Sequence, residues 1–440
     1  MNNKKWTAIL LGGIMAASLA APCSVSAAEK TTLTFWHAMG GTNGEVLQQI
    51  VDDFNASQDE IEIKAEYQGT YDDTITKLKA AMQSDSGLPD VCQMYDVGTK
   101  FMYDSGAVIP VEDKFESTGY DKSSVMEVIS SYYTVDGKQY AMPFNVSTPM
   151  LYYNKDVFEA AGLDPETPPT TYDEVLEDAK KIVESGAAPV GYSQAIYGWF
   201  FEQQLAGLGV TYGNNDNGRK EAVTAVDFDS NGGGLKVFDM WKKLYDSGYF
   251  EDYGTTTADT QTAFFSGQVG MIIESTAILK NAVDSSPFEV GTGYLPRIEQ
   301  NDEGGVIIGG GSLWLTDTGN EANEDAAWKF IEYITTPDVQ AKWSMGTGYF
   351  AINEKAYETE DMKAYLKENP NFETAINQLK DSPVNCNTAG VLSGVQTEAR
   401  LTFNEIMPQV YDGKLTTQDA VDQLAVSVNK AIENYNESIK

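Results

Sequence analysis

The first part of the chain alternates predicted strands with predicted helices, and this order constrains the fold more than any other feature. Apolar residues alternate in residues 31–36 and 61–67, as in strands, and residues 91–94 form a short apolar run. Between these strands, residues 46–54 and 75–82 place apolar side chains on one helical face. Strand–helix–strand–helix–strand is typical of a doubly wound parallel sheet, so we expect an α/β fold.

Ligands of such sheets bind beyond the carboxyl ends of the strands. Residues 37–41, 69–71 and 95–98 follow the three predicted strands and are rich in glycine and aromatic residues. We therefore expect a binding site at this edge. A second α/β lobe is predicted to begin after Pro143, and a last helix is predicted to begin near Thr417.

Charge and composition exclude several classes of protein. The 440 residues hold 30 Lys and Arg against 65 Asp and Glu, a formal net charge of −35. This balance argues against a nucleic-acid partner and against docking on anionic lipid. With one histidine, His37, and three cysteines, the chain cannot build a two-histidine metal site, and we expect no metal and no cofactor.

The first 28 residues have the pattern of a secretory signal peptide. Lys4 and Lys5 precede an apolar run over residues 8–21, and small residues lead to Ala28, after which we expect cleavage. The run is too short for a transmembrane helix. The protein is therefore predicted to be periplasmic or secreted. Lipidation at Cys23 is the alternative, although Pro22 fits a lipoprotein signal poorly.

The remaining cysteines leave two readings open. Cys92 and Cys386 would meet an oxidising compartment and could form a disulfide. Cys92 lies in the apolar run of residues 91–94, which favours a buried thiol instead.

Arginine is scarce in this chain, so its few positions are informative. Arg219, Arg297 and Arg400 are the three arginines, and Arg400 lies among small and polar residues. Its planar fork suits a phosphate or a carboxylate, whereas the alternative is a surface salt bridge. Residues 309–312 (Gly-Gly-Gly-Ser) either form a tight loop or present backbone N–H groups to an anion.

Seven stretches, spread across nearly the whole chain after residue 28, carry a resemblance to a known family: residues 35–41, 69–71, 95–98, 143–149, 152–165, 307–314 and 347–349. They resemble the extracellular solute-binding proteins of bacterial ABC importers. Within that family they are most similar to the glycerol-3-phosphate-binding branch.

The resemblance implies a set of site residues. Those expected to line the site are Tyr71, Asp96, Ser147, Ser275, Gly310, Tyr349 and Arg400, with Trp36 and Trp199 as aromatic walls. Arg400, Tyr349, Ser147 and the Gly310 N–H would donate to a phosphate, and Asp96 would accept from glycerol hydroxyls. Asp96 stands where the family usually has glutamate.

The resemblance also implies a two-lobed periplasmic-binding-protein fold, with a ligand cleft between lobes joined by crossover segments. We expect the first lobe to take residues 29–144 and 275–320 and the second lobe residues 145–274 and 321–440. The implied function is capture of glycerol 3-phosphate or a glycerophosphodiester, such as glycerophosphocholine, for delivery to an ABC permease. We expect a monomer and no enzyme activity.

Two other functions stay open. A neutral sugar or oligosaccharide would be favoured if Arg400 pairs with a carboxylate instead of a phosphate. A secreted glycosidase or phosphodiesterase is disfavoured, because the chain has one histidine and no spacing singles out a pair of carboxylates.

Overall fold

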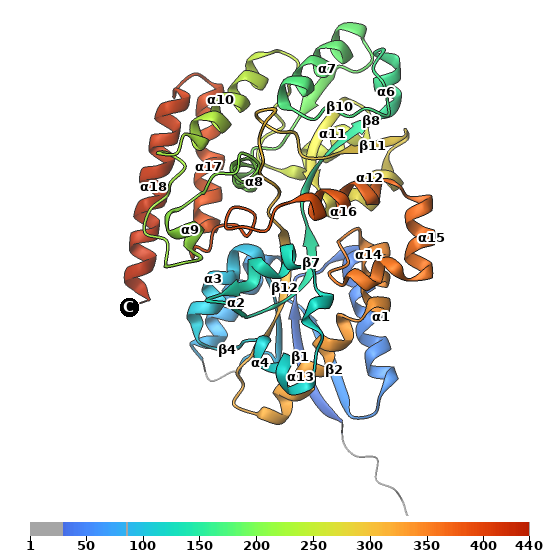
Figure 1. Ribbon diagram of the computed structural model, residues 1–440, viewed down its shortest axis with the longest axis vertical. Helices are drawn as coiled ribbons and strands as arrows, with labels where there is room; N and C mark the ends of the chain where they lie inside the picture. The colour runs from blue at the N-terminus through green and yellow to red at the C-terminus, as the bar shows by residue number, and fades with distance from the viewer. Residues whose placement is uncertain (1–29, 85–86, 440) are drawn as a thin grey trace, which may run out of the picture.

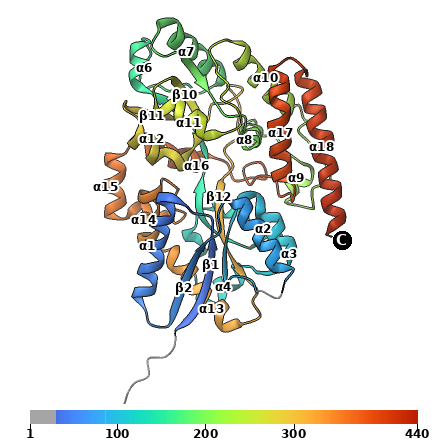
Figure 2. The same cartoon turned by 180° about the vertical axis from the view of Figure 1, so that it is seen from behind.

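Two lobes, each built on its own sheet, make up the computed structural model, which describes residues 30–84 and 87–439 (Figures 1 and 2). The predicted signal peptide, its cleavage after Ala28 and Cys23 lie outside the described residues. The strands of the first sheet are β1 (Thr31–His37), β2 (Ile61–Tyr67), β3 (Val91–Tyr95), β4 (Val108–Ile109), β7 (Met142–Ser147) and β12 (Gly309–Thr316). Those of the second are β8 (Pro149–Asn154), β9 (Val190–Ser193), β10 (Val269–Ser275) and β11 (Val290–Gly293), and β5 (Thr134–Val135) with β6 (Lys138–Gln139) forms a small hairpin.

The first sheet confirms the predicted parallel start. Its order is β2-β1-β3-β12-β4, with β7 beside β12, and β1 pairs in parallel with both β2 and β3. Leu33 and Phe35 of β1 are fully buried, as the alternation predicts. Helix α1 (Gly41–Ser57) begins after Gly40, without a side-chain cap.

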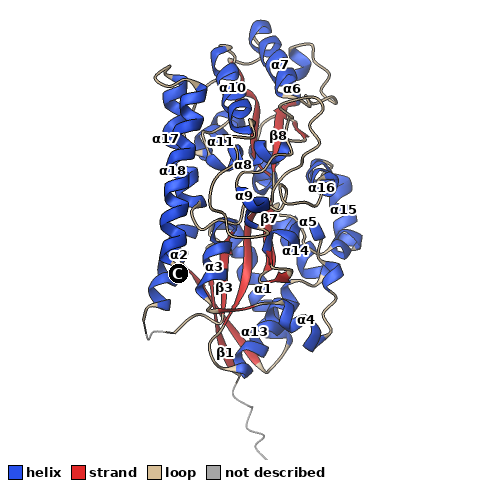
Figure 3. Cartoon of the chain, turned by 60° about the vertical axis from the view of Figure 1, so that its left-hand side comes forward, coloured by secondary structure: helices blue, strands red, loops and turns tan. Residues whose placement is uncertain are grey.

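Helices cover both sheets and form a separate layer beside the second lobe (Figure 3). After α1, those of the first 160 residues are α2 (Tyr71–Met82), α3 (Thr99–Ser105), α4 (Glu112–Thr118), α5 (Glu127–Ser130) and α6 (Lys155–Ala160). The next are α7 (Tyr172–Ser185), α8 (Gly198–Gly207), α9 (Asn214–Gly218), α10 (Gly233–Asp246), α11 (Thr257–Phe265) and α12 (Leu279–Ser285). The last are α13 (Glu321–Ile334), α14 (Pro337–Thr347), α15 (Glu360–Glu368), α16 (Asn371–Asp381), α17 (Gln396–Tyr411) and α18 (Thr417–Ser438).

The chain crosses between the lobes at places that differ from the expected boundaries. Thr148 separates β7 of the first sheet from β8 of the second, and the return lies between β11 and β12. Helices α13 and α14, expected in the second lobe, pack on β1, β12 and α1 of the first, where Phe330 meets the edge of Phe35 at 5.5 Å. Helices α17 and α18 pack on α8 and α10 of the second lobe. An apolar helical face does not say which of two sheets it will cover, so the sequence pattern could not place α13.

Both cysteines of the described chain are free thiols. Cys92 is buried in β3, and Cys386 lies on the segment before α17. Burial raises the pKa of the Cys92 thiol to about 12, so it stays protonated and unreactive. The reading of Cys92 as a buried thiol therefore agrees with the structure. Among the helices described, none combines the length and apolar character needed to cross a membrane.

Helices α8 and α17 approach each other closely, and this contact prepares the site described below. A Cβ atom on Gly198 would lie 2.5 Å from the Cα atom of Arg400. The Gly198 N–H donates to Asn404 Oδ1 at 2.9 Å, and Phe201 stacks on Phe403 at 5.1 Å. The absence of a side chain at Gly198 is what lets the two helices meet.

We expect Gly198→Ala to destabilise the protein by about 1–3 kcal/mol, because the added methyl group must push α8 away from α17. Gly207→Ala is the matched control at the other end of α8, since a Cβ there meets nothing within 4 Å. The control should be neutral or slightly stabilising. Urea unfolding of both variants measures the difference, and equal midpoints would contradict this account of the contact.

Candidate functional site

A cleft of about 540 Å³ lies between the lobes, at the edge of the first sheet where the carboxyl ends of β3 and β7 meet the start of β12. It brings together eight of the nine residues proposed from the sequence: Tyr71, Asp96, Ser147, Ser275, Gly310, Tyr349, Arg400 and Trp199. A larger cavity of about 920 Å³, lined by Arg219 and Cys386 among others, contains none of them. The interlobe cleft is therefore the candidate site.

Trp36 does not line this cleft. It lies half-buried in β1, and its indole Nε1 donates to Glu66 Oε2 at 2.9 Å on the surface of the first lobe. Alternate side chains of a strand point to opposite faces, and Phe35 and His37 take the face packed against the core. The structure thus separates Trp36 from the other proposed site residues.

The first lobe supplies a rigid polar floor. Gln93 Nε2 donates to Asn145 Oδ1 at 2.6 Å, and Asn145 Nδ2 donates to the hydroxyl of Tyr71 at 2.7 Å. The Tyr71 ring stacks on Tyr95 at 5.1 Å. Burial raises the pKa of Tyr71 well above its ordinary value, so its hydroxyl stays protonated. It can therefore donate a hydrogen bond to a solute.

Two glycines shape the wall formed by β12. Gly310 has φ +93°, and a Cβ there would lie 1.9 Å from the backbone oxygen of Asn145. A Cβ on Gly309 would lie 2.8 Å from the indole of Trp199. The segment is the start of strand β12 and not the tight loop that was one of the two alternatives, and its glycines allow close packing there.

Trp199 stands at the start of α8, where that helix enters the cleft. Its indole Nε1 is buried and donates to no residue that the structure describes. A buried donor without a partner is costly, and this N–H belongs to a side chain that lines the cleft.

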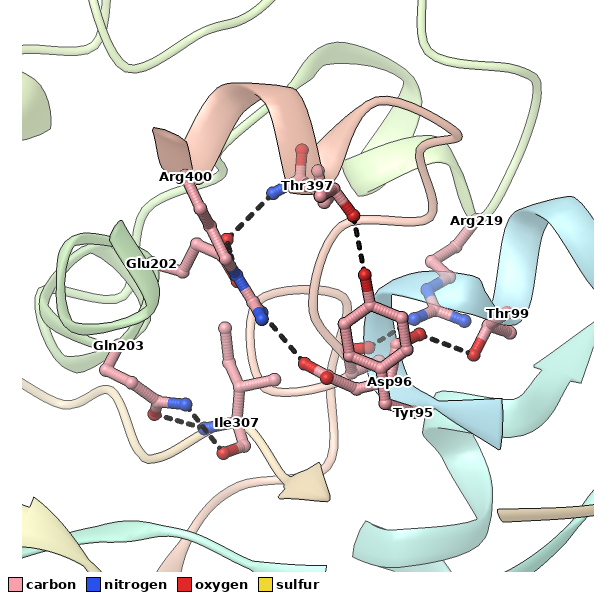
Figure 4. A network of polar contacts seen from close by, with 11 residues as sticks. Tyr95, Asp96, Thr99, Glu202, Gln203, Arg219, Ile307, Thr397 and Arg400 are labelled. Carbon is pink, nitrogen blue, oxygen red and sulfur yellow. Dashed lines mark hydrogen bonds and ion pairs between the residues drawn. The ribbon is translucent and has the colours of Figure 1, made fainter. Parts of the chain in front are cut away.

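Arg400 joins the two lobes, and it is not the surface salt bridge that the sequence left open. Its Nε and Nη2 atoms lie 2.7 Å from the two carboxylate oxygens of Glu202, and Nη2 lies 2.8 Å from Asp96 Oδ2 (Figure 4). All three side chains are at least nine-tenths buried. Asp96 comes from the first lobe, whereas Arg400 and Glu202 come from the second.

The electrostatic environment keeps the Arg400 guanidinium charged. Burial by itself would lower the pKa of Arg400, but Asp96 and Glu202 outweigh it and hold the pKa well above its ordinary value. Burial raises the pKa of Glu202, and the adjacent guanidinium offsets part of this increase. Arg400 Nη1 makes no hydrogen bond to a described residue, although the guanidinium lines the cleft.

Sequence reasoning missed Glu202, the bidentate partner of Arg400. Every residue from Gly198 to Ala206 is buried, so α8 has no polar face that would single out one carboxylate. A glutamate inside such an apolar helix was itself the available signal, because a buried charge needs a partner.

Further contacts tie the lobes beside this cluster. The Tyr95 hydroxyl lies 2.7 Å from Thr397 Oγ1 (Figure 4). The Tyr435 hydroxyl donates to Asp104 at 2.7 Å. Gln203 exchanges two hydrogen bonds of 2.8 Å with the backbone of Ile307, on the segment that leads into β12. The walls of the cleft are therefore held by contacts between protein groups.

Glu274 is a second acidic group of the cleft. It accepts from Gln261 Nε2 at 2.9 Å and from the Ser275 N–H at 2.6 Å. Burial raises its pKa from 4.5 to about 7, and these two hydrogen bonds oppose the rise.

No group of three or more His, Cys, Asp or Glu able to hold a metal ion occurs in the described part of the chain.

We expect Glu274→Gln to stabilise the protein more at pH 8 than at pH 5. Between pH 4.5 and 7 the folded protein keeps a proton that the unfolded chain releases, so stability falls as the pH rises through this window. Glutamine does not titrate, so the variant does not lose stability in this window. The difference in free energy of unfolding between variant and wild type should therefore grow in favour of the variant by as much as about 3 kcal/mol. Urea unfolding at both pH values measures the change, and a constant difference between variant and wild type would contradict it.

Comparisons with known proteins agree with this geometry. The family model described as bacterial extracellular solute-binding protein matches residues 49–374. The sn-glycerol-3-phosphate-binding periplasmic protein UgpB of Escherichia coli (strain K12) is 31% identical over 417 residues, 93% of this chain and 94% of that protein.

Solved structures show the same fold. The cyclic alpha-maltosyl-1,6-maltose binding protein of Arthrobacter globiformis superposes with a TM-score of 0.76 and 26% identity, covering 92% of this chain and 100% of that one. UgpB of Mycobacterium tuberculosis, solved in complex with glycerophosphocholine, gives a TM-score of 0.79 and 20% identity, covering 92% and 99%. Together with the cleft between two α/β lobes, these matches show that the chain belongs to the family of bacterial extracellular solute-binding proteins.

Proposed function

We propose that this protein captures glycerol 3-phosphate or a glycerophosphodiester and delivers it to the transmembrane subunits of an ABC importer. The proposal draws on the relative that is 31% identical and named for sn-glycerol 3-phosphate. It assigns the chain a binding role and not an enzymatic one, in keeping with the relatives from Escherichia coli and Arthrobacter globiformis, which are named as binding proteins.

The observation that carries the proposal is the geometry of Arg400. Among the residues that the structure describes, it is the only lysine or arginine lining the cleft. Glu202 holds one edge of its guanidinium, which leaves Nη1 as a donor for a phosphate oxygen. Ser147, Ser275 and Tyr349 place hydroxyl groups around the same space. Asp96 uses only Oδ2 for Arg400, so Oδ1 can accept from a glycerol hydroxyl.

A neutral sugar is the second candidate, and one observation favours it. Arg400 already pairs with two carboxylates, so the cleft carries no net positive charge. The relative that binds a cyclic maltosyl-maltose also shares 26% of its residues with this chain. Calorimetry against glycerol 3-phosphate, glycerophosphocholine and maltose distinguishes the candidates. Tighter binding of maltose than of either phosphate compound would replace the first proposal by the second.

The place of action follows from the same family. We propose that the predicted signal peptide is removed after Ala28 and that the monomer works outside the cytoplasmic membrane. A lipid anchor at Cys23 remains the alternative.

Arg400→Ala should weaken the binding of glycerol 3-phosphate at least about 30-fold, because a bound anion would lose its charged donor. Arg400→Lys should restore only part of the affinity, since lysine lacks the planar fork. Arg297→Ala removes an exposed arginine and is the matched control. Calorimetry gives the affinities, and thermal unfolding shows whether the two carboxylates left without Arg400 still permit folding. Wild-type affinity in folded Arg400→Ala would refute the role of Arg400.

Trp199→Phe should weaken binding of the solute about fivefold, the scale of one neutral hydrogen bond. The phenyl ring keeps an aromatic face in the cleft but lacks the unpartnered Nε1–H. Trp199→Ala also loses the face and should cost more than about 1 kcal/mol. Calorimetry of both variants separates the two contributions. Equal affinity in all three proteins would assign Trp199 to core packing.

A further inference from the structure

We infer that Glu202 determines which charge state of phosphate the cleft accepts, so that a singly charged phosphodiester is preferred over a doubly charged phosphate monoester. This inference rests on the proposed function. It concerns a residue behind the site, which the resemblance to the solute-binding family did not supply.

Glu202 reaches Arg400 from the side away from the cleft. Its two carboxylate oxygens lie 2.7 Å from Nε and Nη2 of Arg400, and Gln396 Nε2 donates to Oε1 at 3.0 Å. Arg400 and Asp96 line the cleft, whereas Glu202 does not. A bound solute would therefore feel the charge of Glu202 through Arg400 without touching it.

The cluster of Arg400, Glu202 and Asp96 contains more acidic groups than basic ones. One guanidinium, Arg400, faces two carboxylates, Glu202 and Asp96, which gives the cluster a formal net charge of −1. Glu274 adds a further acidic group to the cleft wall, and no lysine lines it among the described residues. A solute must bind where the surroundings are already acidic, and burial strengthens charge–charge interactions there.

The consequence differs between two kinds of phosphate. A phosphate monoester carries nearly two negative charges above its second pKa of about 6, whereas a diester carries one. Each can accept from Arg400 Nη1, but the monoester brings an additional charge next to the acidic cluster. Without Glu202, Arg400 and Asp96 would balance each other and this penalty would decrease.

Two ligands that differ by one charge provide the test: glycerol 3-phosphate and its methyl diester, measured by calorimetry at pH 8. The wild type should bind the methyl diester at least about tenfold more tightly than the monoester. In Glu202→Gln this ratio should decrease by about tenfold. Glu405→Gln removes the same charge from an exposed position on α17, the helix that carries Arg400, and should keep the wild-type ratio.

Each outcome decides a separate question. If the wild type binds neither phosphate compound, the proposed function is wrong and the inference falls with it. If both bind and the wild type favours the monoester or shows no preference, the inference alone is overturned, whether or not Glu202→Gln folds. An unchanged ratio in folded Glu202→Gln would leave Glu202 a purely structural partner of Arg400 and would also overturn it.

Discussion

A buried guanidinium shared by two carboxylates from opposite lobes is the interaction on which the site depends. Taking Arg400, Glu202 and Asp96 out of water is expensive, and the pairs offset this cost only if their geometry is kept. Gly198 makes that geometry available, because its missing side chain lets α8 approach α17. The charge of the cleft therefore depends on the packing of these two helices, and that packing depends on the glycine.

Local patterns predicted much of the fold because they act over short distances. The strands of the first lobe follow from alternation, and helix α7 begins after Thr171, which forms a capping box with Glu174. The last helix, α18, begins at Thr417 as expected. Helix α13 was assigned to the wrong lobe for a different reason. Its apolar face predicts that it covers a sheet, but which sheet it covers depends on tertiary packing.

In the candidate site, too, some features follow from the sequence and others depend on tertiary packing. Eight of the nine residues expected from the resemblance lie together, and they come from strand ends, loops and the helices α2, α8 and α17, which a two-lobed fold brings to one cleft. Trp36 lies outside the cleft because it occupies the strand position between Phe35 and His37, which face the core. A single-residue change of parity moves a side chain to the other face of the sheet. Which carboxylate pairs with Arg400 could not be predicted, since the pairing with Glu202 depends on the contact between α8 and α17.

Asp96 connects binding to the relative position of the lobes. It comes from the end of β3 in the first lobe and pairs with an arginine of the second, next to the contact between Tyr95 and Thr397. A solute oxygen that competes with Asp96 for the guanidinium must replace a charged hydrogen bond that already joins the lobes. A solute stabilises this relative position of the two lobes only if it contacts both lobes at once. A solute with a phosphate near Arg400 and hydroxyl groups near Asp96 meets this condition, because each end engages a different lobe.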